Sequence, residues 1–168
     1  LTKSRKGLAV TQTSWVAHEY HTIERLRRAG ISVPTPIANS GHAFLMDYWG
    51  EIGLPAPTLH MVRLEVAEAR RIFEQTIADI GAMLRLGVIH GDLSAYNILY
   101  WEGRTAIIDF PQVVDPDTNP DARMIFGRDV ERVCGYFGRY GVRSDPRAIA
   151  RAFWAERRVA SPHEDVLA

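Results

Sequence analysis

The sequence is poor in several features that would point to particular classes of protein. Its 168 residues include one cysteine, Cys134, so no disulfide can form within the chain, and a reducing, cytoplasmic setting is expected. No apolar stretch approaches the roughly 20 residues that a membrane-spanning helix needs. The 20 basic residues balance the 20 acidic ones. We therefore expect no membrane partner, and the charge gives no strong signal for nucleic-acid binding.

The residues that are present indicate an α+β fold. A helix is predicted over residues 15–29, two short strands on either side of the turn Asn39–Gly41, and an irregular connector over residues 49–57. A long amphipathic helix is expected over 64–86, a β-hairpin over 97–110, and two further helices over 123–140 and 145–157. Asp145 followed by Pro146 is a good start for the last helix. Residues 1–14 show no pattern, so an irregular or disordered lead-in is expected there.

One constellation of polar residues points to chemistry. Asp92 and Asn97 lie in the polar loop "HGDLSAYN", and Asp109 ends the strand "TAIID". Because a hairpin brings its outer ends together, Asn97 and Asp109 should lie side by side, with Asp92 across the loop. Carboxylate and amide oxygens are hard ligands that suit Mg²⁺, with substrate phosphates completing its shell. This equipment is what phosphoryl transfer requires, so a nucleotide-dependent reaction is predicted.

The same residues match a known pattern. The loop is an H-x-D-L-x-x-x-N catalytic loop, and "IIDF" stands where the D-F-G aspartate stands in the protein-kinase-like fold. Together with "RLRRAGISVPTPI", "FLMDYWGEIGLPAPTL" and "GRDVERVCGYFGRYGV", these blocks resemble the RIO family of atypical serine/threonine kinases and ATPases, in particular its RIO1-like branch. The resemblance covers roughly residues 15–142.

The resemblance implies roles for individual residues. Asp92 would be the catalytic acid, while Asn97 and Asp109 would hold Mg²⁺, with Mn²⁺ as an alternative ion. ATP would be the phosphoryl donor. Its adenine would lie against a hinge, and the residues expected around the nucleotide are Glu19 in the N-lobe helix, Met46 as gatekeeper, Asp47 and Trp49 through their backbone, and Leu99 as the floor. His90 and Asp129 would support the loop structurally.

The resemblance also implies the domain organisation. Residues 1–49 would be a partial N-lobe, made of the helix and short antiparallel strands. Residues 50–168 would be a mainly helical C-lobe with an inserted β-hairpin. A protein substrate or a maturing ribosomal particle would be the partner.

Departures from the family pattern qualify these expectations. Gly91 replaces the arginine of H-R-D, Ser94 stands where many protein kinases have a lysine, and Pro111 replaces the glycine of D-F-G. No glycine-rich loop and no strand lysine precede Glu19, since Lys3 and Lys6 lie in a polar segment. We therefore expect a fragment with little catalytic activity alone, in which Glu19 turns to solvent or pairs with an arginine.

Two other functions remain open at this level. Small-molecule phosphotransferases of the aminoglycoside and choline type share "HGDL…N" and "IID", although they usually carry a longer C-terminal substrate region. The missing glycine-rich loop and lysine would also fit a non-catalytic nucleotide-binding scaffold. The sequence does not identify the phosphate acceptor.

Overall fold

The computed structural model describes the backbone of residues 5–160 and the side chains of residues 15–157. Helix α1 spans Arg5–Arg28 and thus begins well before the expected start at Trp15. The expectation of an irregular lead-in is therefore wrong for residues 5–14, and its first four residues lie outside the described range. The physical reason is that this segment contains no proline, and an established helix extends at little cost through residues of moderate propensity.

The end of α1 agrees with the sequence prediction. Gly30 adopts a left-handed backbone, with φ of 80°, which a helix C-terminus favours. The Ile31 N–H donates back to the Leu26 carbonyl at 3.1 Å. Ile31 and Val33 are buried immediately afterwards, so the chain turns sharply from the helix into the core.

Two small hairpins follow α1. Strands β1 (Pro36–Asn39) and β2 (Phe44–Met46) pair antiparallel around the predicted turn, where the Asn39 side chain accepts a hydrogen bond from the Gly41 N–H at 2.7 Å. The expected irregular connector contains a second hairpin, β3 (Gly50–Glu51) with β4 (Leu54–Pro55). Each of its strands is two residues long, too short for a period-2 pattern to appear in the sequence.

The predicted long helix and central hairpin are both present in the structure. Helix α2 spans Val66–Arg85 and stops before Gly87, which has φ of 72°. Strands β5 (Ile98–Trp101) and β6 (Arg104–Ile107) pair antiparallel, with Ile98 opposite Ile107. Both turn residues, Glu102 and Gly103, have positive φ, as a type I′ turn requires. Short 3₁₀ turns at Leu59–Met61 and Ala95–Asn97 complete this region.

The last two helices also lie close to their predicted positions. Helix α3 spans Ala122–Gly138 and α4 spans Pro146–Ala160. The Asp145 carboxylate accepts hydrogen bonds from the N–H groups of Arg147 and Ala148, each at 3.0 Å, so it caps α4 as expected. Among the described residues, no helix is both long enough and apolar enough to span a membrane.

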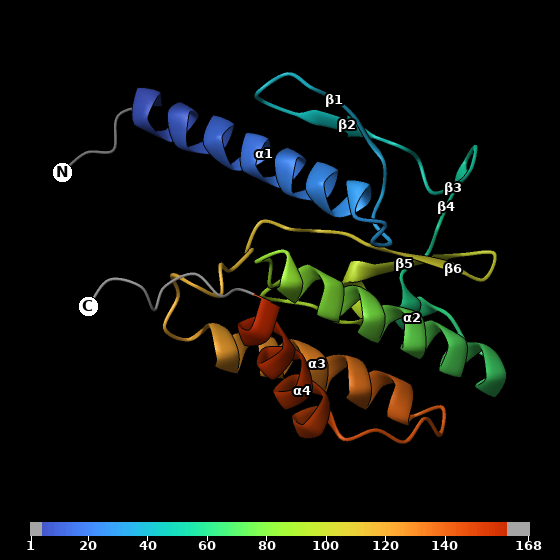
Figure 1. Cartoon of the computed structure of the whole chain (residues 1–168). Helices are drawn as coiled ribbons and strands as arrows, with labels where there is room; N and C mark the ends of the chain where they lie inside the picture. The colour runs from blue at the N-terminus through green and yellow to red at the C-terminus, as the bar shows by residue number, and fades with distance from the viewer. Residues whose placement is uncertain (1–4, 161–168) are drawn as a thin grey trace, which may run out of the picture.

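The elements are arranged in two groups with the β5–β6 hairpin between them. Figure 1 shows α1 beside the β1–β2 hairpin at one end of the molecule and α2, α3 and α4 together at the other. A continuous core joins the groups, because Leu26 and Ile31 from the first group belong to the same buried cluster as Leu84, Ile98 and Phe137. The polar loop, residues 90–97, leads directly into β5 of the central hairpin.

Candidate active site

The backbone of the polar loop is held by a buried carboxylate. Asp129 on α3 is almost fully buried, and its two oxygens accept hydrogen bonds from the N–H groups of Gly91 at 2.8 Å and Leu93 at 3.1 Å. Burial raises the pKa of Asp129, although the hydrogen bonds from these two N–H groups and the charge of Arg128 act in the opposite direction. The interpretation of Asp129 as a structural support is confirmed.

His90 supports the same loop from the other side. Its ring is buried, lies 4.9 Å from the Phe110 ring, and places Nε2 at 3.0 Å from the Ile108 carbonyl oxygen. Because a carbonyl only accepts, Nε2 carries the proton, and Nδ1 is left to accept from the Asp92 N–H at 3.4 Å. His90 therefore connects the loop to the segment after β6 that contains Asp109, as a packing residue.

The structure brings the three predicted residues together at one rim. The Asn97 side-chain amide donates to the Asp92 carbonyl oxygen at 3.0 Å, which ties the two ends of the loop. The Ile108 N–H donates to the Asn97 carbonyl at 3.0 Å, so Asn97 lies beside the residue that precedes Asp109. Asp109 is exposed and has a left-handed backbone with φ of 69°, an uncommon conformation that aspartate tolerates.

The chemistry of these side chains fits a hard divalent cation. The Asn97 amide nitrogen is used within the loop, so its oxygen faces the opposite way and is available as a ligand. The Asp109 carboxylate makes no hydrogen bond to another described residue. Within the described residues, no three His, Cys, Asp or Glu side chains gather as a self-sufficient metal site. Two oxygen ligands completed by phosphates and water are what Mg²⁺ uses in nucleotide sites.

The sequence reasoning missed an arginine that contacts the predicted catalytic acid. Arg132 Nη1 lies 2.5 Å from Asp92 Oδ1, and the two side chains are 40% and 51% exposed. Arg132 follows Asp129 by three residues on α3, so the two share a helix face. This spacing was the sequence signal that could have placed Arg132 near the loop. An open groove of about 720 Å³ begins at this pair and is also lined by Arg139, Tyr96 and His60. The rings of His60 and Tyr96 are stacked, with their centroids 3.9 Å apart.

Glu19 differs from its prediction. The expectation that it would turn to solvent or pair with an arginine is wrong, because its carboxylate accepts a hydrogen bond from the Phe110 N–H at 3.2 Å. The sequence could not show this contact, which joins residues 91 positions apart. Phe110 itself is fully buried, so the bond connects α1 directly to the backbone that follows Asp109.

The predicted hinge residues lie along the connection between β2 and β3. Met46 ends β2 with a half-exposed side chain. Asp47 is held twice by Thr35, since its N–H donates to the Thr35 carbonyl at 2.9 Å and its carboxylate accepts the Thr35 N–H at 2.6 Å. The Trp49 carbonyl accepts the Ala56 N–H at 2.9 Å. In the described part of the chain, neither the Asp47 carbonyl nor the Trp49 N–H bonds to another backbone group.

Leu99 lies on β5, alongside the segment that follows the hinge. It is paired with Ala106 on β6 and bridged to Thr58, and the neighbouring Tyr100 N–H donates to the Pro57 carbonyl at 2.9 Å. The structure therefore brings the post-hinge segment against the hairpin that carries Asn97 and leads to Asp109.

Comparisons with known proteins agree with this geometry. A family model described as the RIO domain matches residues 2–149. The chain is 33% identical over 135 residues to the RIO-type serine/threonine-protein kinase Rio1 of Thermoplasma acidophilum, covering 80% of this chain and 69% of the relative. It is 33% identical over 132 residues to the protein of the same name in Haloferax volcanii, covering 79% and 44%.

A human relative, serine/threonine-protein kinase RIO1, is 34% identical over 130 residues, which cover 77% of this chain and 23% of the relative. The chain thus spans less than half the length of the human and Haloferax proteins. The family model nevertheless matches most of the chain, including the loop held by Asp129 and the segment after β6 that contains Asp109. The chain belongs to the RIO family.

Proposed function

We propose that this chain is part of a RIO-type serine/threonine protein kinase or ATPase that transfers the terminal phosphoryl group of Mg²⁺-bound ATP. The observation that carries the proposal is the convergence of Asp92, Asn97 and Asp109 on one rim, around a loop held by Asp129. In this proposal residues 1–49 form part of the N-lobe and residues 50–168 form the C-lobe, with the nucleotide between them.

Each residue at the rim has a separate role in the proposed phosphoryl transfer. ATP would supply the phosphoryl group, and Mg²⁺ would neutralise the charge of its phosphates. Asn97 and Asp109 would hold the metal through oxygen atoms, as their chemistry allows. Asp92 orients the acceptor hydroxyl or water and takes its proton. Because Arg132 contacts Oδ1 of Asp92, the other carboxylate oxygen is the one left for the acceptor.

The hinge supplies the adenine contacts in this proposal. The Asp47 carbonyl and the Trp49 N–H are one acceptor and one donor on the same connection, and both are unused by other backbone groups of the described chain. An adenine edge presents the complementary donor and acceptor. Met46 would border this site as gatekeeper, and Leu99 would pack under the ring.

The phosphate side of the site explains why we expect slow turnover from this polypeptide alone. A carboxylate oxygen of Glu19 accepts the Phe110 N–H. Lys6 lies in α1 and not on a strand. No lysine of this chain is therefore placed as a strand residue paired with Glu19 within the described range. A protein substrate or a maturing ribosomal particle as partner, and a cytoplasmic location, are part of the same proposal and are supported by family resemblance.

The proposal is tested by separating nucleotide binding from transfer. Calorimetric titration with ADP is done with and without Mg²⁺ on the chain and on three variants. Asp109→Asn should weaken Mg²⁺-dependent binding by about tenfold or more, because it removes a charged ligand. Asp92→Asn should bind within about twofold of the parent but lose about 100-fold or more in single-turnover transfer.

The matched control is Asp121→Asn, an exposed carboxylate that makes no side-chain cap bond at the start of α3. It should change neither binding nor transfer. The proposal fails if Asp109→Asn binds Mg²⁺-ADP as tightly as the parent, or if Asp92→Asn transfers phosphate at the parental rate.

A further inference from the structure

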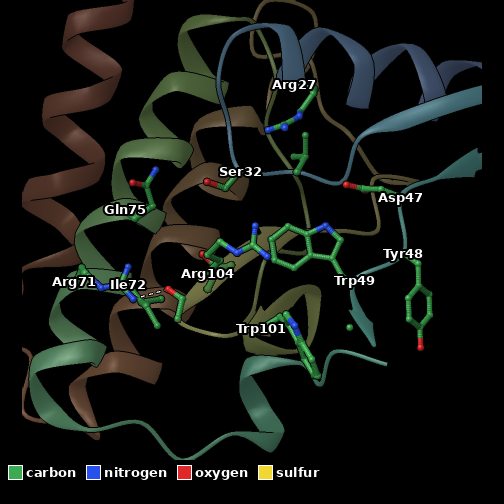
Figure 2. A pocket seen from close by; sticks show the side chains of 14 residues that line it. Arg27, Ser32, Asp47, Tyr48, Trp49, Arg71, Ile72, Gln75, Trp101 and Arg104 are labelled. Atoms are coloured by element: carbon green, nitrogen blue, oxygen red, sulfur yellow. Dashed lines mark hydrogen bonds between the residues drawn. The ribbon is translucent and has the colours of Figure 1, made fainter. Parts of the chain in front are cut away.

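A second hollow lies beside the hinge connection between β2 and β3. It has a volume of about 420 Å³ and is formed by the end of α1, the residues between β2 and β3, the start of α2 and the turn between β5 and β6. Figure 2 shows the side chains that line it. We call it the arginine pocket, after Arg27, Arg71 and Arg104. None of the three catalytic-rim residues lines it.

The three arginines come from distant parts of the sequence and converge on one space. Arg27 is near the end of α1, Arg71 is on α2, and Arg104 begins β6. Figure 2 shows Arg27 reaching in from above, with Arg104 below it and Arg71 at one side. The pocket lining contains a single carboxylate, Asp47, whose oxygen already accepts the Thr35 N–H.

The partners of these arginines leave most of their donors unused. Arg71 donates one N–H to the Gly103 carbonyl at 2.5 Å and lies 4.0 Å from the Glu68 carboxylate. Arg104 is stacked over the Trp49 ring at 5.6 Å. The Arg27 side chain forms no ion pair or hydrogen bond with the described residues. Each guanidinium has five N–H donors, so most of them point to the pocket or to water.

This arrangement differs from that of other arginines in the described chain. Arg28 is paired with Glu24 at 2.8 Å, and Arg132 with Asp92. Arg27 and Arg104, by contrast, have no carboxylate within ion-pair distance in the described chain. Like charges gathered around one space repel each other, and a bound anion would relieve that repulsion.

We propose that the arginine pocket binds the phosphate group of a small phosphomonoester. A planar carboxylate is satisfied by one guanidinium, whereas a tetrahedral dianion has enough acceptor sites for three guanidinium groups approaching from different directions. The indole rings of Trp49 and Trp101 lie beside the arginines and offer flat apolar surface to the organic part of the ligand. The volume is within the range of small-molecule sites. This inference does not depend on the phosphoryl-transfer function.

The test uses phenyl phosphate, inorganic phosphate and phenol as probes, at constant ionic strength and with a chelator to remove divalent metal. Binding is followed by two-dimensional NMR of the tryptophan indole N–H groups, with signals assigned through Trp49→Phe and Trp101→Phe. We expect saturable shifts of these two signals with both phosphates, tighter binding of phenyl phosphate, and no saturable shift with phenol.

The variants Arg27→Gln and Arg104→Gln should each raise the dissociation constant for phenyl phosphate by about tenfold, because each removes a charge-assisted hydrogen-bond donor. Arg28→Gln is the matched control: it is the adjacent arginine on the same helix, is paired with Glu24 and does not line the pocket. It should leave binding unchanged, and thermal unfolding should confirm that all three variants fold.

Three results would overturn the proposal. The first is the absence of saturable phosphate binding below about 10 mM, a level weaker than a specific three-arginine site should show. The second is an Arg27→Gln, Arg104→Gln double variant that binds phenyl phosphate as tightly as the parent. The third is an equal loss of affinity in Arg28→Gln, which would indicate a general response to net charge.

Discussion

At the scale of single residues, Gly91 shows why this catalytic loop departs from H-R-D. Its backbone is left-handed, with φ of 87°, and a Cβ atom there would lie 2.5 Å from the Gln112 carbonyl oxygen. Both observations exclude a side chain without movement of the backbone. The arginine of the usual motif would not fit here, because this loop passes close to the segment that follows Asp109.

This close approach leads to a prediction for Gly91→Ala. The substitution should lower the free energy of unfolding by about 2 kcal/mol or more, from backbone strain and the clash together. Urea denaturation measures the change. Gly135→Ala is the control, because Gly135 lies within α3 and a Cβ there meets no atom within 4 Å. It should be neutral or slightly stabilising, and equal effects of the two substitutions would contradict the steric explanation.

At the scale of elements, helix α4 depends on Asp145, the residue that immediately precedes it. Asp145 accepts two N–H groups of the first turn. Asp145→Ala should therefore lower the free energy of unfolding by about 1 kcal/mol in urea denaturation. Asp121 occupies the same position at the start of α3 but makes no side-chain cap bond. Asp121→Ala should cost clearly less, and a larger loss at Asp121 would show that hydrogen bonding is not what the Asp145 position contributes.

Helix α2 carries a buried carboxyl group that should make stability depend on pH. Burial raises the pKa of Asp79 above 3.8, although hydrogen bonds from Ser32 and Gln75 oppose the shift. The native state therefore holds the Asp79 proton more tightly than the unfolded state does. The resulting stabilisation is complete below the unfolded pKa and is lost as pH rises through the raised native pKa.

Asp79→Asn removes this titration. The free energy of unfolding of the variant, minus that of the parent, should increase as pH rises from about 4 and should level off above the native pKa. Denaturation curves at a series of pH values measure this difference. Parallel pH profiles for the two proteins would rule out a raised native pKa at Asp79.

The sequence was a good guide to elements whose signals are local. Residue chemistry within a few positions predicts where two helices end, at Gly30 and Gly87. It also predicts the Asp145 cap and the Glu102–Gly103 turn. The placement of Asn97 near Asp109 follows from the same hairpin. The β3–β4 hairpin was missed because its strands are two residues long, and the early start of α1 was missed because residues 5–14 have weak preferences.

At the scale of the whole molecule, the contacts that could not be predicted are those between distant segments. Arg132 with Asp92 and Glu19 with Phe110 join residues 40 and 91 positions apart. No local period or spacing encodes such a pair, since it depends on how the elements pack. Glu19 is the clearer case: its carboxylate connects α1 to the backbone of Phe110, the residue that follows Asp109.

This connection can be tested by hydrogen exchange. In Glu19→Ala the Phe110 amide should exchange about fivefold to tenfold faster, because it loses a hydrogen bond to a charged acceptor. The Ile107 amide is an internal control, since it donates to the Ser32 carbonyl at 2.7 Å and should keep its rate. Glu19→Gln retains an acceptor oxygen and should restore protection at Phe110. Unchanged exchange at Phe110 in Glu19→Ala would exclude the bond.

The left-handed backbone at Asp109 limits which residues this position can accept. Aspartate and glutamate are the two residues that could supply a carboxylate at this position. Of the two, only aspartate readily adopts a backbone with φ of 69°. Glutamate would bring the charge with greater backbone strain, and asparagine would keep the conformation without the charge. The backbone geometry of one peptide unit and the charge that the proposed metal site requires are therefore met together by aspartate alone.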